Sequence, residues 1–249
     1  DLNGISKEKI YSRDQNILHI SHEGGMLEDP ANEPDFDEIL VMTNTVENAP
    51  NEAEYIEIEF KEGIPVKLNK EELNGEQMLR ALNKIGGKHG IGVVDLLENR
   101  LVGMKSRGVY ETPGGTLLIE AHKYLESLVL EKETAQFKDI ISKKYAELVY
   151  NAMWFSGLKE AFDAFIDSTQ KNVTGVVKLK LYKGTIKFAG MKSENALYNE
   201  SISSFSTGDL YNQKDAGGFI NLYSLPFKIK SLNKINNDGA SEVKYTFKE

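Results

Sequence analysis

EYIEIEFKEGIPVKL, residues 54–68, alternates apolar and charged side chains on both sides of a short turn. Ile56, Ile58 and Phe60 share one face of an extended chain, and the glutamates between them share the other. This period of two predicts a half-buried strand, and the KEG that follows predicts the turn of a β-hairpin. Because proline has no N–H to donate, Pro65 places the second strand at an edge or at its own first position.

A second hairpin is predicted in the last third of the chain, where GVVKLKLY and TIKFAG flank the turn KG. Val177, Leu179 and Leu181 alternate with lysines, which again indicates a half-buried strand. Between the two hairpins, apolar residues at helical spacing predict a helix within residues 70–90. We expect the pair Gly86–Gly87 to end that helix.

Two further predictions concern the middle of the chain. IGVVDLL (91–97) is short, apolar and rich in β-branched residues, so we expect a buried strand there. Apolar residues at helical spacing over 117–166 predict a long helical region, interrupted at Gly157.

The C-terminal part carries an apolar stripe at helical spacing, formed by Phe219, Leu222, Tyr223 and Phe227. Pro226 should start or kink this helix. Because exposed apolar stripes tend to be covered by partner subunits, we expect an oligomerisation helix here.

The predicted order of elements is hairpin, helix, strand, helices, hairpin, helix, without a regular βαβ alternation. We therefore expect an α+β fold, with hairpins and a mixed sheet, several packed helices and the C-terminal oligomerisation helix. Residues 1–235 are expected to form one domain, and residues 236–249 a frayed tail.

Composition narrows the class of protein. The 249 residues carry a formal net charge of −8, which argues against a nucleic-acid binder, because such proteins rely on excess lysine and arginine. The absence of cysteine excludes disulfides, thiol catalysis and cysteine-bound metals. No apolar run approaches the length of a membrane span, and no signal peptide opens the chain, so we expect a cytoplasmic protein.

The segment ENRLVGMKSRGVYETPGG (98–115) concentrates charges, glycines and a tyrosine. It could be a solvated loop, a phosphate-binding loop or part of a small-molecule site. A phosphate-binding loop needs glycines that open a helix after a strand, with Lys and Ser or Thr at fixed offsets. GMKSRG lacks the preceding glycine spacing, so the other two interpretations remain.

Other candidate sites have less support. His19 and His22 are three residues apart, close enough to share a metal, but no HExxH-like pattern accompanies them, and we expect no metal site. Glu98 and Glu111 are a carboxylate pair of the kind that glycosidases use, although spacing in sequence does not determine spacing in the fold.

Five blocks of the sequence together resemble the argininosuccinate synthase family. They are YSRDQNILHISHEGGMLEDP (11–30), LNKIGGKHGIG (82–92), ENRLVGMKSRGVYETPGG (98–115), KYAELVYNAMWFS (144–156) and VTGVVKLKLYKG (173–184). The resemblance extends over nearly all of residues 10–225, in the order of the family.

The resemblance implies a carbon–nitrogen ligase of arginine biosynthesis, which condenses citrulline and aspartate to argininosuccinate and converts ATP to AMP and pyrophosphate. It implies that ATP with Mg²⁺ is bound mainly by an N-terminal nucleotide-binding domain, whose SGGLDTS-type loop is absent from this chain. The chain is then expected to be the C-terminal catalytic and multimerisation domain, inactive alone, which completes the citrulline site and builds a homotetramer. No cofactor, no metal and no catalytic residue are expected in this chain itself.

The family's citrulline contacts correspond to Ser12, Ser21, Glu98 and Tyr110. Two hydroxyls, a carboxylate and a phenol offer both donors and acceptors to a ureido group or an amino-acid head group. The alternative is a self-standing amino-acid-binding or oligomerisation module that shares the fold without the catalysis.

Some residues depart from the family pattern or have no assigned contact. Ile10, His22 and the pair Ile119–Glu120 replace other residue types, and His22 is expected to alter the pocket wall near Ser21. We expect Lys105 and Arg107 to hold the KSRG connection through ion pairs rather than to touch substrate.

Overall fold

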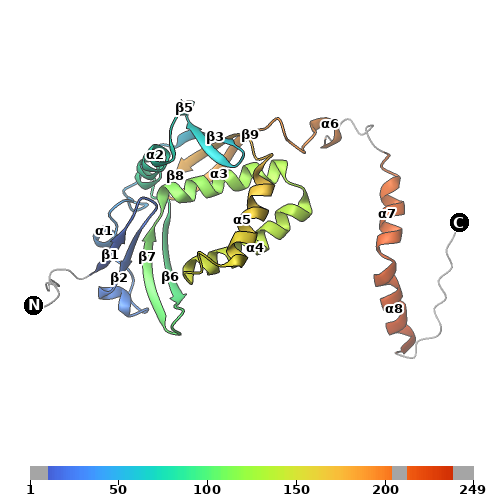
Figure 1. Cartoon of the computed structure of the whole chain (residues 1–249), viewed down its shortest axis with the longest axis horizontal. Coiled ribbons are helices and arrows are strands. Elements are labelled where there is room, and N and C mark those ends of the chain that lie inside the picture. The colour runs from blue at the N-terminus through green and yellow to red at the C-terminus, as the bar shows by residue number, and fades with distance from the viewer. Residues whose placement is uncertain (1–10, 204–211, 238–249) are drawn as a thin grey trace, which may run out of the picture. The chain divides into compact units, whose positions relative to one another are not determined.

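The computed structural model describes residues 11–203 and 212–237 (Figure 1). The chain divides into two compact units, residues 1–197 and 198–249. The first unit combines helices with two sheets, which confirms the α+β class. Every strand pairing among the described residues is antiparallel, so the prediction of a mixed sheet is wrong. Ile10 and most of the predicted frayed tail lie outside the described residues.

The larger sheet joins both predicted hairpins. Its strands, in spatial order, are β5 (Glu71–Glu72), β4 (Ile64–Leu68), β3 (Glu54–Lys61), β8 (Gly175–Tyr182) and β9 (Thr185–Lys192). β3 pairs with β8 along its length, so the two hairpins lie side by side. The described pairing of β5 with β4 involves only Lys67 and Leu68, which leaves Pro65 on an uncovered edge, as its missing N–H requires.

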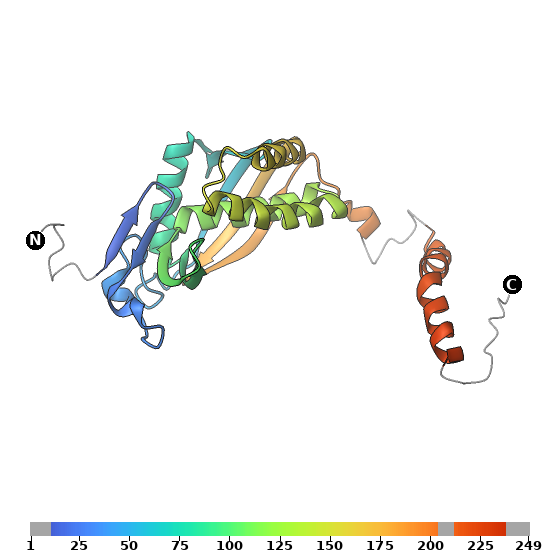
Figure 2. The ribbon, with the colours of Figure 1, turned by 60° about the horizontal axis from the view of Figure 1, so that its bottom comes forward.

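One face of this sheet packs against two helices, α2 (Gly75–Lys88) and α3 (Pro113–Val129), as Figures 1 and 2 show. The predicted inward residues of both hairpins are buried. The core consists of Ile56, Ile58, Phe60, Leu68, Met78, Leu82, Ile91, Leu117, Ala121, Leu125, Val129, Val173, Val177, Leu179 and Leu181. Burial of these alternating side chains is what fixes the register of the sheet.

Helix α2 begins at a capping box on Asn74 and ends later than predicted. Gly86–Gly87 lie inside the helix, and the glycine that follows its end is Gly90, with φ of +72°. The two inner glycines instead permit close packing, because a Cβ on Gly87 would lie 2.1 Å from the carbonyl oxygen of Met42. The predicted stop is therefore wrong by a few residues, for a tertiary reason.

The long helical region is confirmed. After α3 it continues as α4 (Lys132–Tyr150) and α5 (Gly157–Gln170). Gly157 is the first residue of α5, directly after a serine cap, so it marks the predicted interruption. In Figure 1 the α4–α5 pair lies beside the smaller sheet.

The smaller sheet has four strands. In spatial order they are β1 (Ser12–Gln15), β2 (Ile20–Glu23), β7 (Lys105–Glu111) and β6 (Val93–Asn99). β6 is an edge strand whose residues are mostly exposed, so the prediction of a buried strand at 91–97 is wrong in burial. Short helical turns, η1 (Gly25–Glu28) and α1 (Phe36–Ile39), cover one face through a small core of Leu27, Ile39 and Val109.

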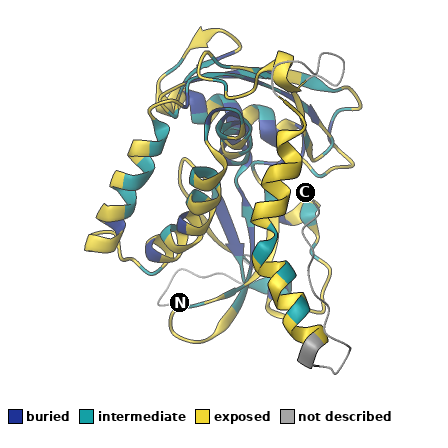
Figure 3. Cartoon of the chain, turned by 90° about the vertical axis from the view of Figure 1, so that its right-hand side faces the viewer, coloured by how far each residue is buried: buried dark blue, intermediate teal, exposed yellow. Residues whose placement is uncertain are grey.

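The described part of the second unit contains α6 (Glu200–Ser203), α7 (Asp215–Tyr223) and α8 (Leu225–Asn237). The predicted apolar stripe falls on α7 and α8, and its four side chains are exposed (Figure 3). Pro226 is the second residue of α8, so a new helix starts there, as expected.

Candidate functional site on the four-stranded sheet

Antiparallel pairing brings the predicted site residues of β1, β2 and β7 together. Ser21 lies directly opposite Tyr110, so their side chains point to the same face of the sheet. Ser12 lies opposite Glu23, which is two residues from Ser21 and therefore shares that face. Ser21 is buried and Ser12 is exposed.

Glu98 joins the same face from the edge strand. Tyr110 pairs with Val94, and Glu98 is four residues further along β6, an even number that returns its side chain to that face. The hydroxyl of Tyr110 donates a hydrogen bond to Oε1 of Glu98. We call this surface, formed by Ser12, Ser21, Glu98 and Tyr110, the polar face.

The Glu98 carboxylate accepts a second hydrogen bond, from a phenol that the sequence did not predict. Tyr150, the last residue of α4, donates its hydroxyl to Oε2 of Glu98 at 2.5 Å. The bond from Tyr110, followed by that from Tyr150, holds the pKa of Glu98 below its usual value. Burial and the neighbouring Glu98 raise the pKa of Tyr110, so the carboxylate is ionised and the phenol is neutral near pH 7.

Gly108 allows Tyr110 to reach Glu98. The two residues are separated by several positions along the hairpin, so the ring must lie along β7 over Gly108. A Cβ on Gly108 would lie 2.9 Å from Cε2 of Tyr110. Any side chain at this position would therefore displace the ring.

A guanidinium adds positive charge beside the polar face. Nη2 of Arg100 donates to Oε2 of Glu23 at 2.7 Å and to Oγ of Ser106 at 3.2 Å. The proximity of Glu23 raises the pKa of Arg100 further. The polar face thus combines hydroxyls, carboxylates and a cation, which suits a small polar molecule with both donors and acceptors.

His22 and Glu111 point to the opposite face of the sheet. Nε2 of His22 lies 2.7 Å from Oε1 of Glu111, and both side chains are fully buried. Glu111 also accepts the backbone N–H groups of Val41 and Met42, at 2.9 and 2.8 Å. The expectation that His22 alters the wall near Ser21 is wrong, because adjacent residues of a strand point to opposite faces.

The same alternation separates the two carboxylates of the glycosidase interpretation. Glu98 shares its face with Tyr110, whereas Glu111 follows Tyr110 directly in β7 and points away from that face. The carboxyl groups therefore do not flank a common substrate, and the pair does not support glycoside chemistry.

The KSRG segment is strand rather than connection. Lys105 is the first residue of β7, and the turn of this hairpin lies at 100–104. Arg107 forms the expected ion pair, with Nη2 and Nε at 2.7 and 3.0 Å from the Asp95 carboxylate, and it also donates to the backbone carbonyl of Asn32 at 2.9 Å. Lys105 donates to the amide oxygen of Asn99 at 2.6 Å instead of forming an ion pair.

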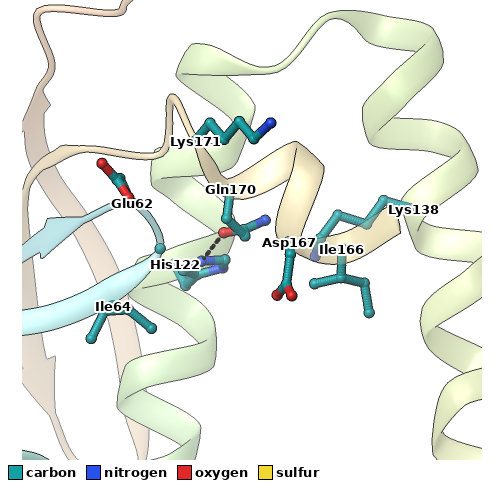
Figure 4. A pocket seen from close by; sticks show the side chains of 9 residues that line it. Glu62, Ile64, His122, Lys138, Ile166, Asp167, Gln170 and Lys171 are labelled. Atoms are coloured by element: carbon teal, nitrogen blue, oxygen red, sulfur yellow. Dashed lines mark hydrogen bonds between the residues drawn. The ribbon is translucent and has the colours of Figure 1, made fainter. Parts of the chain in front are cut away.

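A separate polar cluster lies between α3, α4 and α5, beside a cavity of about 450 Å³ (Figure 4). Nε2 of His122 lies 2.8 Å from Oε1 of Gln170, and burial lowers the pKa of His122. Gln170 donates to Glu126 at 2.8 Å, and Lys138 of α4 pairs with Glu126 at 3.0 Å. None of the four polar-face residues lines this cavity, and the cluster fastens the α4–α5 pair to α3.

Tyr150 could not be found from sequence spacing. It lies in the block KYAELVYNAMWFS, but its partner Glu98 is 52 positions away. Helical periodicity describes which face of α4 is apolar and gives no information about which strand meets its last turn.

Among the described residues, no group of three or more His, Cys, Asp and Glu could hold a metal ion, and no helix could cross a membrane.

The fold and the polar face define a class: an α+β domain that presents a polar face on an antiparallel sheet. The family model described as arginosuccinate synthase C-terminal domain matches residues 11–230. The chain therefore belongs to the argininosuccinate synthase family, in its C-terminal domain.

Curated relatives agree with this assignment. The argininosuccinate synthase of Clostridium novyi is 60% identical over 233 residues, which are 94% of this chain and 58% of the relative. That of Thermoanaerobacter sp. (strain X514) is 57% identical over 239 residues, 96% of this chain and 58% of the relative. That of Desulfitobacterium hafniense (strain DSM 10664 / DCB-2) is 58% identical over 228 residues, 92% of this chain and 57% of the relative. The chain thus spans less than two thirds of the length of these relatives.

Proposed function

We propose that this chain is the C-terminal part of a ligase that condenses citrulline and aspartate to argininosuccinate, with ATP converted to AMP and pyrophosphate. The printed names of the relatives and their identity of 57–60% support this reaction. In this reaction the ureido oxygen of citrulline attacks the α-phosphate of ATP, and the amine of aspartate then displaces AMP.

The polar face is our proposed citrulline site. The observation that carries this proposal is that Ser12, Ser21, Glu98 and Tyr110 come from four strands and share one face. Ionised Glu98 accepts hydrogen bonds, so it suits the N–H donors of citrulline. The two serine hydroxyls can donate to its oxygens or accept from its nitrogens.

The remaining parts of the reaction are assigned to a preceding nucleotide-binding domain. We propose that this domain binds aspartate and ATP with Mg²⁺, and that the present chain contributes substrate contacts but no catalytic residue. The proposal also includes a cytoplasmic homotetramer, in which the exposed apolar stripe on α7 and α8 packs against other subunits.

The test is pyrophosphate release from ATP that depends on both citrulline and aspartate. It is measured on this chain alone and after addition of the N-terminal part of the Clostridium novyi relative, the part that this chain does not cover. We expect no release from the chain alone and release on mixing. A matched mixture that contains Glu98→Gln should lose most of the activity, because the amide cannot supply the negative charge.

Two results would contradict the proposal. Release by the chain alone would place the nucleotide chemistry in this chain. A folded mixture that binds no citrulline by calorimetry, and releases no pyrophosphate, would instead favour an oligomerisation module without catalysis.

A further inference from the structure

We infer that Tyr150 is a positioning residue for Glu98 and thereby for citrulline, an inference that rests on the proposed function. Tyr110 occupies Oε1 of the carboxylate and Tyr150 occupies Oε2. The two phenols come from different elements, β7 and α4, so together they fix the rotation of the carboxylate plane. With only one of them, the carboxylate could turn about its last bond.

The end of α4 is built so that Tyr150 is its final residue. The N–H of Met153 donates to the carbonyl of Leu148 at 2.8 Å, and the N–H of Ala152 donates to that of Val149 at 3.1 Å. These two bonds are a Schellman motif, which ends a helix with a residue in the left-handed conformation. Here that residue is Ala152, with φ of +58°, where glycine is the usual choice.

The corner between α4 and α5 is held by a second set of contacts. Lys159 is 9% exposed; its Nζ pairs with Asp163 at 2.8 Å and lies 4.0 Å from the ring centre of Trp154. Tyr145 of α4 also donates to Asp163, at 2.8 Å. The polar cluster of His122, Glu126, Lys138 and Gln170 anchors the first half of α4 to α3, and the corner around Lys159 anchors the end of α4. Tyr150 is therefore presented to Glu98 by a fixed helix.

Exposure separates this role from ordinary packing. Tyr150 is 52% exposed, so its side chain contributes little to the hydrophobic core. Its specific interaction is the hydrogen bond between the phenol and the carboxylate. Tyr150→Phe therefore removes the interaction and preserves the ring. Tyr55→Phe is a matched control, because Tyr55 is 51% exposed and lies on β3 of the other sheet.

The first experiment titrates Glu98 by NMR in the chain labelled with ¹³C at the glutamate carboxyl groups, with Glu98→Gln used to assign the signal. Tyr150→Phe removes a donor that stabilises the ionised form, so the pKa of Glu98 should rise toward its usual value. Tyr55→Phe should leave that pKa unchanged. An unchanged Glu98 pKa in Tyr150→Phe would overturn the inference.

The second experiment measures citrulline affinity by calorimetry on the chain mixed with the N-terminal part of the Clostridium novyi relative. We expect Tyr150→Phe to weaken binding by about tenfold, the usual effect of one hydrogen bond to a charged group, with thermal unfolding unchanged. If Glu98→Gln abolishes binding while Tyr150→Phe binds as tightly as wild type, the positioning role is wrong and the proposed function stands. If wild type itself does not bind citrulline, both fail.

Discussion

Gly108 is the residue on which the position of the Tyr110 ring depends. We predict that Gly108→Ala turns the ring aside, because the added Cβ would lie 2.9 Å from it. The Tyr110 bond is the largest cause of the lowered Glu98 pKa, so that pKa should rise. Carboxyl NMR would measure the change, and citrulline affinity should fall at the same time.

The control for this change is Gly157→Ala. Nothing lies within 4 Å of a Cβ built on Gly157, and this residue lies at the start of α5. The control should leave the Glu98 titration as in wild type. A wild-type titration in Gly108→Ala as well would mean that the Tyr110 ring does not need the space above the glycine.

A pH dependence of stability follows from Glu98. Its pKa in the folded chain is lowered from the ordinary value of 4.5, so the folded state binds this proton less readily than the unfolded state. The resulting stabilisation is complete above the unfolded pKa and is lost as the pH falls through the folded pKa. We predict that wild type loses more of its free energy of unfolding than Glu98→Gln between pH 6 and pH 3.

Denaturant titrations at several pH values would measure both curves. The difference between wild type and Glu98→Gln should shrink at the acid end. Parallel curves over this range would show that Glu98 has the same pKa in the folded and unfolded states.

At the scale of elements, the end of α4 is strained at Ala152. A left-handed conformation costs a non-glycine residue about 1–2 kcal/mol, whereas glycine loses about 0.4–1 kcal/mol more through the unfolded state. We therefore predict that Ala152→Gly raises the free energy of unfolding by up to about 1 kcal/mol.

Ala146→Gly is the comparison, because Ala146 is exposed and lies in the interior of the same helix, where glycine costs about 1 kcal/mol. Urea unfolding of both variants would give opposite signs. Destabilisation of similar size in both would mean that Ala152 is not strained.

Local pattern predicted the hairpins and the helices well, because alternation and helical spacing record which side of an element is buried. It failed where burial depends on a distant partner. The apolar run at 91–97 became an exposed edge strand, since its pattern does not say how many neighbours the strand has. Gly86 and Gly87 did not end α2. Instead, Gly86 allows close contact with Pro113, and Gly87 allows close contact with the loop at Met42.

For the candidate site too, local pattern predicts part of the geometry, and contacts between distant elements determine the rest. Once β7 is known to be a strand, alternation places Tyr110 on one face and Glu111 on the other. The shared face of Ser21 and Tyr110 requires the register between β2 and β7, which sequence spacing does not contain. Tyr150 required the docking of a helix beside a strand, and no local signal encodes that contact.

At the scale of the whole molecule, the prediction concerns α7 and α8. Phe219, Leu222, Tyr223 and Phe227 are each 63–72% exposed, and Phe219 stacks on Tyr223 with ring centres 5.3 Å apart. Water contact with so much apolar surface is unfavourable, so a partner subunit should cover it. Light scattering should therefore find a tetramer for the full chain and smaller species for a chain truncated at Ala216.

A chain that ends at Asn237 is the control, since it keeps both helices, and it should assemble as the full chain does. A tetramer that survives truncation at Ala216 would place the interface elsewhere. A full chain that is monomeric at micromolar concentration would contradict the assembly itself.

Successive side chains of β7 point to opposite faces of the sheet and serve a different purpose on each face. Ser106, Gly108 and Tyr110 serve the polar face, whereas Arg107 and Glu111 fasten loops to the other side. In a saturation scan of this strand, substitutions at every second position should therefore change ligand preference. Substitutions at the intervening positions should instead reduce expression. An engineer could alter the polar face at alternate positions, in small steps, without touching the residues that keep the protein folded.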